Sequence, residues 1–223
     1  MDKSDQRAPS LPNRRSIRLC GYDYTQSGAY FVTLRAHGRR HIFGRVENGQ
    51  IHLSPIGAIA DQEWNAIPEH CERITIDTYC VMPNHIHGII VIHEQIRNMA
   101  PLRTSKRIAR SFGWPVSRSL SAIVGSYKSG VTRRVRQLGM SLETPLWQSW
   151  FYDHIIRDNV DFFLIKQYIG LNPIFWEYDI DNPCSKSISF EDLEALVRKR
   201  TDIEGATLFM IMSSNRIGKI RIR

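Results

Sequence analysis

Two strand-like segments, residues 73–82 and 85–92, are separated only by Pro83 and Asn84, and this pair constrains the fold more than any other feature. Both segments are rich in β-branched and apolar residues, which favour strands. Proline and asparagine between two such runs mark a break, so the two segments are predicted to be separate strands. The chain is therefore expected to contain a β-sheet.

The other periodic segments alternate between strands and helices. Further strands are predicted at residues 30–34, 45–53 and 150–156, and helices at residues 54–68, 117–138 and 158–173. Asn48-Gly49 is a typical hairpin turn, and Ser54 and Asp158 are typical residues at a helix start. Strands interleaved with helices predict an α+β fold, in which an antiparallel sheet has its helices packed on one face.

Composition divides the chain into three parts. Residues 1–28 are polar and basic, with a cluster that includes Arg14 and Arg15, and resemble an arm. Residues 29–176 carry the periodic segments and are expected to form the folded domain. Residues 177–223 begin with acidic residues and end in RIGKIRIR, and we treat them as a C-terminal extension.

The bulk composition limits the cellular setting. Four cysteines show no C-x-x-C spacing and no signal peptide is evident, which predicts reduced thiols in the cytoplasm. The longest apolar run is far too short to span a bilayer, so no membrane partner is expected. A net charge of +8 favours a polyanionic partner.

The positive charge is concentrated in residues 95–142, which contain no Asp or Glu. A solvated helix face usually mixes signs, so a run of one sign favours a phosphate-binding surface over a merely basic loop and helix. Together with Arg14 and Arg15 of the arm, the predicted DNA contacts in this run are Arg103, Lys106, Arg107, Arg110, Lys128, Arg133, Arg134 and Arg136.

Two histidines, His85 and His87, stand at the head of an apolar strand-like segment. Side chains alternate across a strand, so both project to one face, about 6.6 Å apart along it. Two imidazoles at that spacing can converge on one metal ion, although an H-x-H pair also occurs as polar side chains that bind no metal. No cysteine cluster is available to complete a closed zinc site, and an open site suits a catalytic ion that meets a phosphate oxygen.

The last predicted helix carries Tyr168 and Asn172 in the segment KQYIGLNP. At positions i and i+4 they share one helix face, with Cβ atoms about 6 Å apart. The amide oxygen could serve as a third ligand to an ion held by His85 and His87, with the tyrosine hydroxyl beside it. The alternative is a core tyrosine, with Asn172 closing the helix before a proline.

These residues resemble those of the REP-associated tyrosine transposases, within the single-tyrosine HUH endonucleases. The resemblance covers about residues 14–176. It is carried by an ordered set of segments, which are RRSIRLCGYDY, GAYFVTL, YCVMPNHIHGIIVI, IVGSYKS, LWQSWFYDHIIRD and YIGLNP.

The resemblance implies a ferredoxin-like fold in which residues 29–176 form the catalytic domain. It implies that His85, His87 and Asn172 bind Mg²⁺ or Mn²⁺ and that Tyr168 is the nucleophile. The implied substrate is single-stranded DNA with hairpins, the REP-like palindromes of bacterial chromosomes. The implied reaction is cleavage and strand transfer through a 5′-phosphotyrosine, by a nucleoid-associated cytoplasmic enzyme.

Several alternatives stay open at this level. A protein that binds DNA hairpins but has lost cleavage is the main rival function, and a structural metalloprotein is a third. Tyr127 lies in the apolar stripe of its helix and is expected to be packed, and Tyr152 has no ligand-type partner four residues on. One complete ligand set in the chain favours a monomer, although family relatives that exchange the tyrosine helix leave a domain-swapped dimer open.

Overall fold

The computed structural model describes the parts of the chain on which the fold depends. These are Leu19, residues 21–71, 73–94, 119–140 and 144–201, and Ile203, Thr207, Leu208 and Ile211. Most of the predicted arm, the loop expected at residues 95–116 and the end of the C-terminal extension lie outside the described residues.

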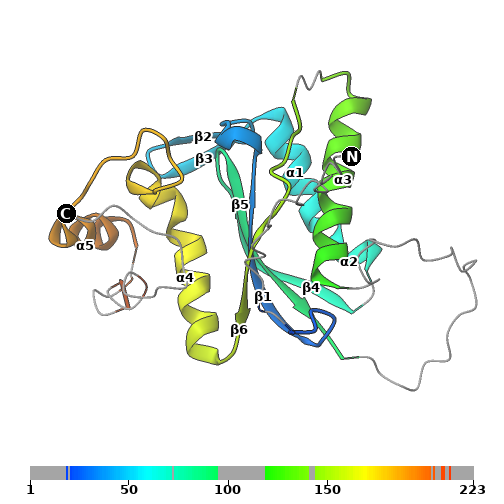
Figure 1. The fold of residues 1–223 in the computed structure, drawn as a ribbon. Coiled ribbons are helices and arrows are strands. Elements are labelled where there is room, and N and C mark those ends of the chain that lie inside the picture. The colour runs from blue at the N-terminus through cyan, green and yellow to red at the C-terminus, as the bar shows by residue number, and fades with distance from the viewer. Residues whose placement is uncertain are drawn as a thin grey trace, which may run out of the picture.

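A four-stranded antiparallel sheet lies at the centre of the molecule (Figure 1). The strand order is β4, β5, β1 and β6, with bounds Ile74–Val81, His85–Ile92, Gly28–Arg35 and Tyr152–Ile156. Helix α1 (Pro55–Asn65) lies between β1 and β4 in the chain, and α3 (Leu120–Gln137) lies between β5 and β6. This strand–helix–strand–strand–helix–strand order confirms the predicted ferredoxin-like α+β fold.

A separate two-stranded hairpin precedes α1. It consists of β2 (Gly44–Glu47) and β3 (Gln50–Leu53), and η1 (His37–Arg39) lies between it and β1. Asn48 and Gly49 at its turn have φ of 53° and 75°, the positive values that a tight hairpin turn requires. The hairpin predicted around this dipeptide is confirmed.

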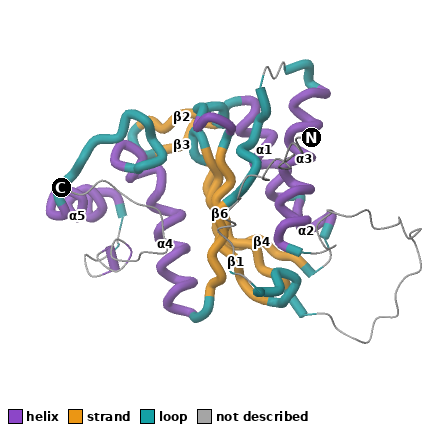
Figure 2. The backbone as a smooth tube through the Cα atoms, in the orientation of Figure 1, coloured by secondary structure: helices purple, strands orange, loops and turns teal. Residues whose placement is uncertain are grey.

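Helices cover both faces of the sheet, so the prediction of helices on one face is wrong (Figures 1 and 2). The helices α1 and α3 pack on one face, against Tyr30 and Ile90 among others. Helix α4 (Asn159–Phe175) packs on the other, against Phe31 and Ile89. The physical reason is that β1 and β5 carry apolar side chains at both parities, so each face of the sheet has apolar surface to bury.

Capping residues set the helix starts as expected, whereas prolines do not set the ends. Ser54 accepts the Gly57 N–H at 3.0 Å to begin α1, and Asp158 accepts the Asp161 N–H at 2.8 Å to begin α4. Pro68 does not end α1 but lies in the first turn of a short helix, α2 (Ile67–His70). Helix α4 likewise continues two residues past Pro173, because a proline in the last turn costs only one backbone hydrogen bond.

Part of the predicted C-terminal extension packs on the same sheet face as α4. The chain leaves α4 through η2 (Trp176–Tyr178) and forms α5 (Phe190–Arg200), whose Leu193 and Val197 are buried. They share one apolar cluster with Phe31 of the sheet and Ile165 of α4. Within the described part of the chain, no helix has the length and apolar character needed to cross a membrane.

Candidate active site

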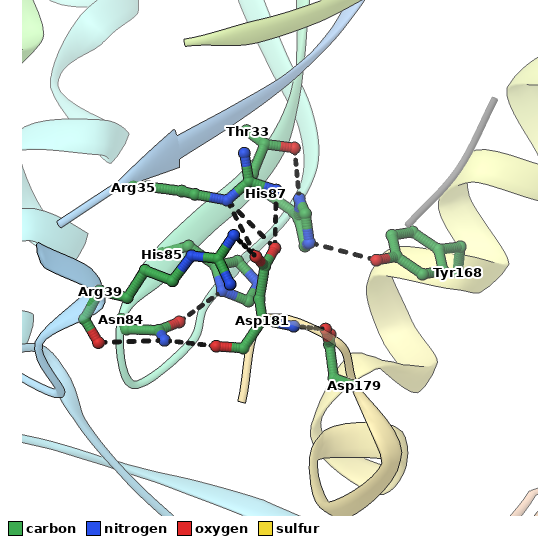
Figure 3. Close-up of polar contacts among 9 residues, drawn as sticks. All are labelled: Thr33, Arg35, Arg39, Asn84, His85, His87, Tyr168, Asp179 and Asp181. Carbon is green, nitrogen blue, oxygen red and sulfur yellow. Dashed lines mark hydrogen bonds and ion pairs between the residues drawn. The ribbon is translucent and has the colours of Figure 1, made fainter. Parts of the chain in front are cut away.

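The two histidines of β5 lie side by side on the sheet face that α4 covers. Their ring centroids are 4.4 Å apart, and the side chains of His85 and His87 are both buried. The ring of Tyr168 on α4 lies 5.3 Å from that of His87. The structure therefore brings the predicted histidine pair and the predicted tyrosine together, as Figure 3 shows.

One ring nitrogen of His87, Nε2, faces the hydroxyl of Tyr168. His87 Nε2 lies 3.3 Å from the hydroxyl oxygen of Tyr168, and its Nδ1 lies 2.9 Å from Oγ1 of Thr33. Thr33 is the residue of β1 directly opposite His87 in the sheet. The neighbouring strand thus fixes the ring of His87, and Nε2 is its nitrogen nearest the Tyr168 hydroxyl.

The ring of His85 is fixed by a hydrogen bond at Nδ1. Its Nδ1 lies 2.8 Å from Oδ1 of Asn84, the residue just before it. Its Nε2 is buried and has no hydrogen-bond partner among the described residues, and the same holds for Oδ1 of Asn172. Asn172 lies one turn beyond Tyr168 on α4, and it is only 1% exposed. Buried polar atoms without partners are costly in a folded protein, and the Asn172 side chain interacts with both His85 and Tyr168, so these two atoms are candidate ligands for a bound ion.

Burial keeps both histidines neutral. It lowers the pKa of His85 to about 4, and it lowers the pKa of His87 well below its ordinary value, with His85 and Arg35 adding to the effect. Neutral imidazole is the form that binds metal ions, so both rings are ready to act as ligands at neutral pH. The described residues hold no cluster of three His, Cys, Asp or Glu side chains suited to a metal. The amide of Asn172 is a candidate third protein ligand, because its Oδ1 is buried without a partner among the described residues.

The candidate nucleophile is a protonated phenol in the absence of metal. Burial raises the pKa of Tyr168 above its ordinary value, and the nearby carboxylate of Asp179 adds to the shift. The ring is 3% exposed and lies edge-on to Phe31, with centroids 6.3 Å apart. A tyrosine in this setting needs a nearby positive charge to become an effective nucleophile.

A second group of polar residues lies at the same site and was not predicted from the sequence. Arg35 of β1, directly opposite His85, forms an ion pair with Asp181, with its Nη2 2.8 Å from Oδ2. The Nδ2 atom of Asn84 donates to the backbone oxygen of Asp181 at 2.7 Å. Asp181 follows η2 and was seen in the sequence only as part of an acidic stretch. Figure 3 shows how this segment lies against the start of β5.

Asp179, in the same segment, should make stability depend on pH. Burial raises the pKa of its carboxyl to about 7, against about 3.9 for Asp in an unfolded chain. A folded-state pKa that is raised favours the protonated form, so stability is lost as pH rises from about 4 through about 7. Asp179→Asn removes this loss and keeps an oxygen to accept the Asp181 N–H, which lies 2.7 Å from Oδ1.

We therefore expect Asp179→Asn to melt several degrees above the parent protein at pH 8. Each kcal/mol is worth about 2–4 °C in Tm for a protein of this size. Thermal unfolding followed by circular dichroism from pH 4 to pH 9 measures the difference. The gap should be smallest near pH 4, grow up to about pH 7 and stay level above it, and a gap that is constant over the whole range would contradict the assignment.

Of the other tyrosines and histidines that were considered, Tyr152 packs edge-on against Phe31 on the same sheet face, and Tyr127, His154 and His93 have partners elsewhere. Tyr127 is 4% exposed and donates its hydroxyl to the Ala60 carbonyl at 2.9 Å, which confirms that it is packed. His154 pairs with Asp161 of α4 at 2.7 Å, and His93 pairs with Oγ1 of Thr75 at 2.8 Å.

Four of the predicted phosphate-binding residues are described, and all lie on α3. Lys128, Arg133 and Arg136 line a surface pocket of about 640 Å³ beside the segment that leads into β6. Arg134 instead pairs with Glu63 of α1 at 3.3 Å. The remaining predicted DNA-binding residues lie outside the described residues: Arg14, Arg15, Arg103, Lys106, Arg107 and Arg110.

Lys128 is the most enclosed of these cations. Burial lowers its pKa to about 8, and its Nζ donates to the backbone oxygen of Gln148 at 2.8 Å. The same nitrogen lies 5.9 Å from the centre of the Trp147 ring. Helix α3 packs on the opposite face of the sheet from Tyr168, so the basic pocket and the histidine–tyrosine cluster are on different sides of the sheet.

Comparison with known proteins supplies relatives of this chain. No protein-family model matches it. An uncharacterized protein of Haemophilus influenzae is 37% identical over 169 residues, which cover 76% of this chain and 93% of the relative. A second protein of that organism, provisionally named as a REP-associated tyrosine transposase, is 23% identical over 158 residues, 68% of this chain and 73% of the relative.

Two solved structures are also similar. One is a REP-associated tyrosine transposase bound to a REP hairpin, with a TM-score of 0.46 and 19% identity over 68% of this chain and 69% of that chain. The other, provisionally named as a transposase, is from Deinococcus radiodurans R1, with a TM-score of 0.38 and 15% identity over 68% of this chain and 94% of that chain.

The first relative is similar over nearly its whole length, and the second carries the family name. The chain is therefore a relative of the first protein over nearly the whole of that protein, and it is similar in sequence to a protein named for the REP-associated tyrosine transposases.

Proposed function

We propose that this protein is a metal-dependent endonuclease and strand transferase for single-stranded DNA that carries REP-like hairpins. The observation that carries the proposal is the convergence of four groups from β5 and α4. The hydroxyl of Tyr168 lies 3.3 Å from His87 Nε2, and His85 Nε2 and Asn172 Oδ1 are buried with no hydrogen-bond partner among the described residues. All four groups come from one chain, which supports a monomer.

A divalent cation fits this donor set. His85, His87 and Asn172 would hold Mg²⁺ or Mn²⁺, and the amide and phosphate oxygens favour such a hard ion. When bound, the ion polarises the phosphodiester and stabilises the charge that develops on it. Three protein ligands leave positions open for substrate oxygens.

The protein's own residues perform the transfer. The Tyr168 oxygen forms a bond to phosphorus and gives up its proton, while the bond from phosphorus to the 3′ oxygen breaks and that oxygen takes up a proton. The products are a 5′-phosphotyrosine and a free 3′-OH. Because one phosphodiester replaces another, the covalent bond retains the energy for rejoining, and the reverse attack by a 3′-OH joins strands.

A cleavage assay separates this proposal from its main rival, a protein that binds hairpins without cutting them. Hairpin DNA with labelled single-stranded flanks is incubated with the protein, with Mn²⁺, Mg²⁺ or EDTA, and run on native and denaturing gels. The proposal expects a shifted complex in every lane and a cleaved strand only with metal. Binding without any cleavage would favour the rival, and metal uptake without DNA binding would indicate a structural metalloprotein.

We further propose that the basic pocket on α3 binds the DNA backbone. Lys128, Arg133 and Arg136 line it, and its other wall precedes β6, an edge strand of the sheet. The reacting cluster lies on the other sheet face. A substrate that contacts both would therefore pass around the β6 edge, with its hairpin held apart from the phosphate that reacts.

Neutralising this pocket should weaken the salt dependence of DNA binding. For Arg133→Gln with Arg136→Gln, the slope of log affinity against log salt is expected to fall by about 0.7–0.9 for each phosphate that the variant no longer neutralises. Fluorescence anisotropy with a labelled hairpin at several salt concentrations measures the slope. Arg134→Gln is the matched control, because that side chain pairs with Glu63, and it should change the slope less. An unchanged slope in the double variant would place the DNA elsewhere.

A further inference from the structure

The side chain of Asn84 occupies a buried position between three partners. It is 1% exposed, and its Nδ2 donates to the backbone oxygen of Asp181 at 2.7 Å and to that of Arg39 at 3.3 Å. Its Oδ1 lies 2.8 Å from Nδ1 of His85. Asn84 thus joins a candidate metal ligand to a segment that follows α4, as Figure 3 shows.

These partners decide which way the amide points. Backbone carbonyl oxygens can only accept hydrogen bonds, so the NH₂ group of Asn84 must face Asp181 and Arg39. Its oxygen must then face His85, and an amide oxygen can only accept. His85 therefore carries its hydrogen on Nδ1, and in the neutral ring Nε2 keeps a free lone pair.

The tautomer of His87 is not fixed by its partners. Its Nδ1 faces the hydroxyl of Thr33, which can either donate or accept, and its Nε2 faces the hydroxyl of Tyr168. Of the two rings, only His85 has its tautomer set by a group that cannot change roles. Its Nε2 is also the ring atom that is buried without a partner among the described residues.

We propose that Asn84 is a positioning residue that holds His85 in the tautomer and orientation needed to bind the metal through Nε2. The proposal rests on the metal-dependent function proposed above and adds a residue to it. Groups that hydrogen-bond to the far nitrogen of a metal-binding histidine fix its ring and tautomer, and their loss typically costs about 10–100-fold in metal affinity.

The segment after α4 in turn holds Asn84. The carboxylate of Asp181 accepts hydrogen bonds from Nε and Nη2 of Arg35, at 3.1 Å and 2.8 Å, and this pairing fixes the backbone oxygen that Asn84 needs. Asp181 and Arg35 are 146 positions apart in the sequence. The start of the predicted C-terminal extension therefore contributes to the proposed metal site through Asn84.

The test reads the tautomer directly in metal-free protein. Protein labelled with ¹⁵N-histidine is examined by NMR at a pH at which the rings are neutral, because the two tautomers give different ¹⁵N shifts. We expect hydrogen on Nδ1 of His85 in the parent protein and loss of this preference in Asn84→Ala. Calorimetric titration with Mn²⁺ should show affinity about 10–100-fold weaker in that variant.

Two further variants sharpen the test. Asn84→Asp keeps an oxygen facing His85 but loses the NH₂ group that donates to Asp181 and Arg39, so the folded variant should retain the Nδ1 tautomer and bind Mn²⁺ more tightly than Asn84→Ala but less tightly than the parent protein. Asn182→Ala is the matched control, because this buried amide contacts Trp176 and Cys184 rather than His85, and it should leave the tautomer unchanged.

Hydrogen on Nε2 of His85 in the parent protein would overturn the proposal, and so would full Mn²⁺ affinity in a folded Asn84→Ala. If Asn84→Ala does not fold, the tautomer of His85 in the parent protein and the Mn²⁺ affinity of Asn84→Asp test the proposal. These measurements need no DNA cleavage. A protein that shows the expected tautomer and Mn²⁺ affinity but never cuts DNA would contradict the proposed function and still support the role of Asn84.

Discussion

Tyr168→Phe is expected to abolish covalent attachment to DNA while the protein still folds and still binds hairpins. The change removes only the oxygen proposed to attack phosphorus, and the ring keeps its packing against Phe31 and His87. The variant lacks the hydrogen bond between the hydroxyl and His87 Nε2, which spans 3.3 Å, and one such bond is worth about 1 kcal/mol. Loss of activity should therefore be complete at little cost in stability.

The measurement is the yield of a protein–DNA adduct that survives denaturation, after incubation of labelled single strands with Mn²⁺. Tyr127→Phe is the matched control, because Tyr127 is equally buried and its hydroxyl donates to the Ala60 carbonyl on the opposite sheet face. The control should form the adduct as the parent protein does. An adduct in Tyr168→Phe at the parent yield would rule out Tyr168 as the nucleophile.

Replacing either histidine of β5 with alanine should remove metal binding and cleavage together. His85 and His87 supply two of only three proposed protein ligands, and an ion held by one histidine and an amide would bind weakly. Calorimetric titration with Mn²⁺ is expected to show no binding in the range of the parent protein. Hairpin binding should stay within a few-fold, because the basic pocket on α3 is on the other face of the sheet.

His93→Ala provides the control for this pair. His93 follows the same strand and pairs with Oγ1 of Thr75, away from Tyr168, so metal binding and cleavage should survive its loss. Robust nicking by the His85→Ala, His87→Ala double variant in the presence of EDTA would show that no metal held at this site is needed.

The local part of the site could be predicted from the sequence, because short-range geometry determines it. Alternation along a strand places His85 and His87 on one face, and helical spacing places Asn172 one turn from Tyr168. That the two pairs face each other follows from the packing of α4 on the sheet. The sequence already indicated this packing, because apolar residues of β5 project to both faces of the sheet. Helices were nevertheless predicted on one face only.

The contacts that support the site could not be predicted in this way. Arg35 and Asp181 are 146 positions apart, and nothing in their local sequence indicates that they pair. Pro83 and Asn84 were interpreted only as a break between strands, although a residue next to a metal-binding histidine can hold its ring. Whether the segment after α4 turns back onto β5 depends on the course of the chain beyond Pro173, where α4 runs two residues further than predicted.

The central claim is that the hydroxyl of Tyr168 attacks the DNA. Parent protein is incubated with a cleavable single-stranded hairpin substrate and Mn²⁺, the adduct is digested with protease, and the modified peptide is sequenced by mass spectrometry. The expected result is one DNA-linked peptide, with the 5′ phosphate on residue 168. Attachment to Tyr127, Tyr152 or any other residue would contradict the assignment.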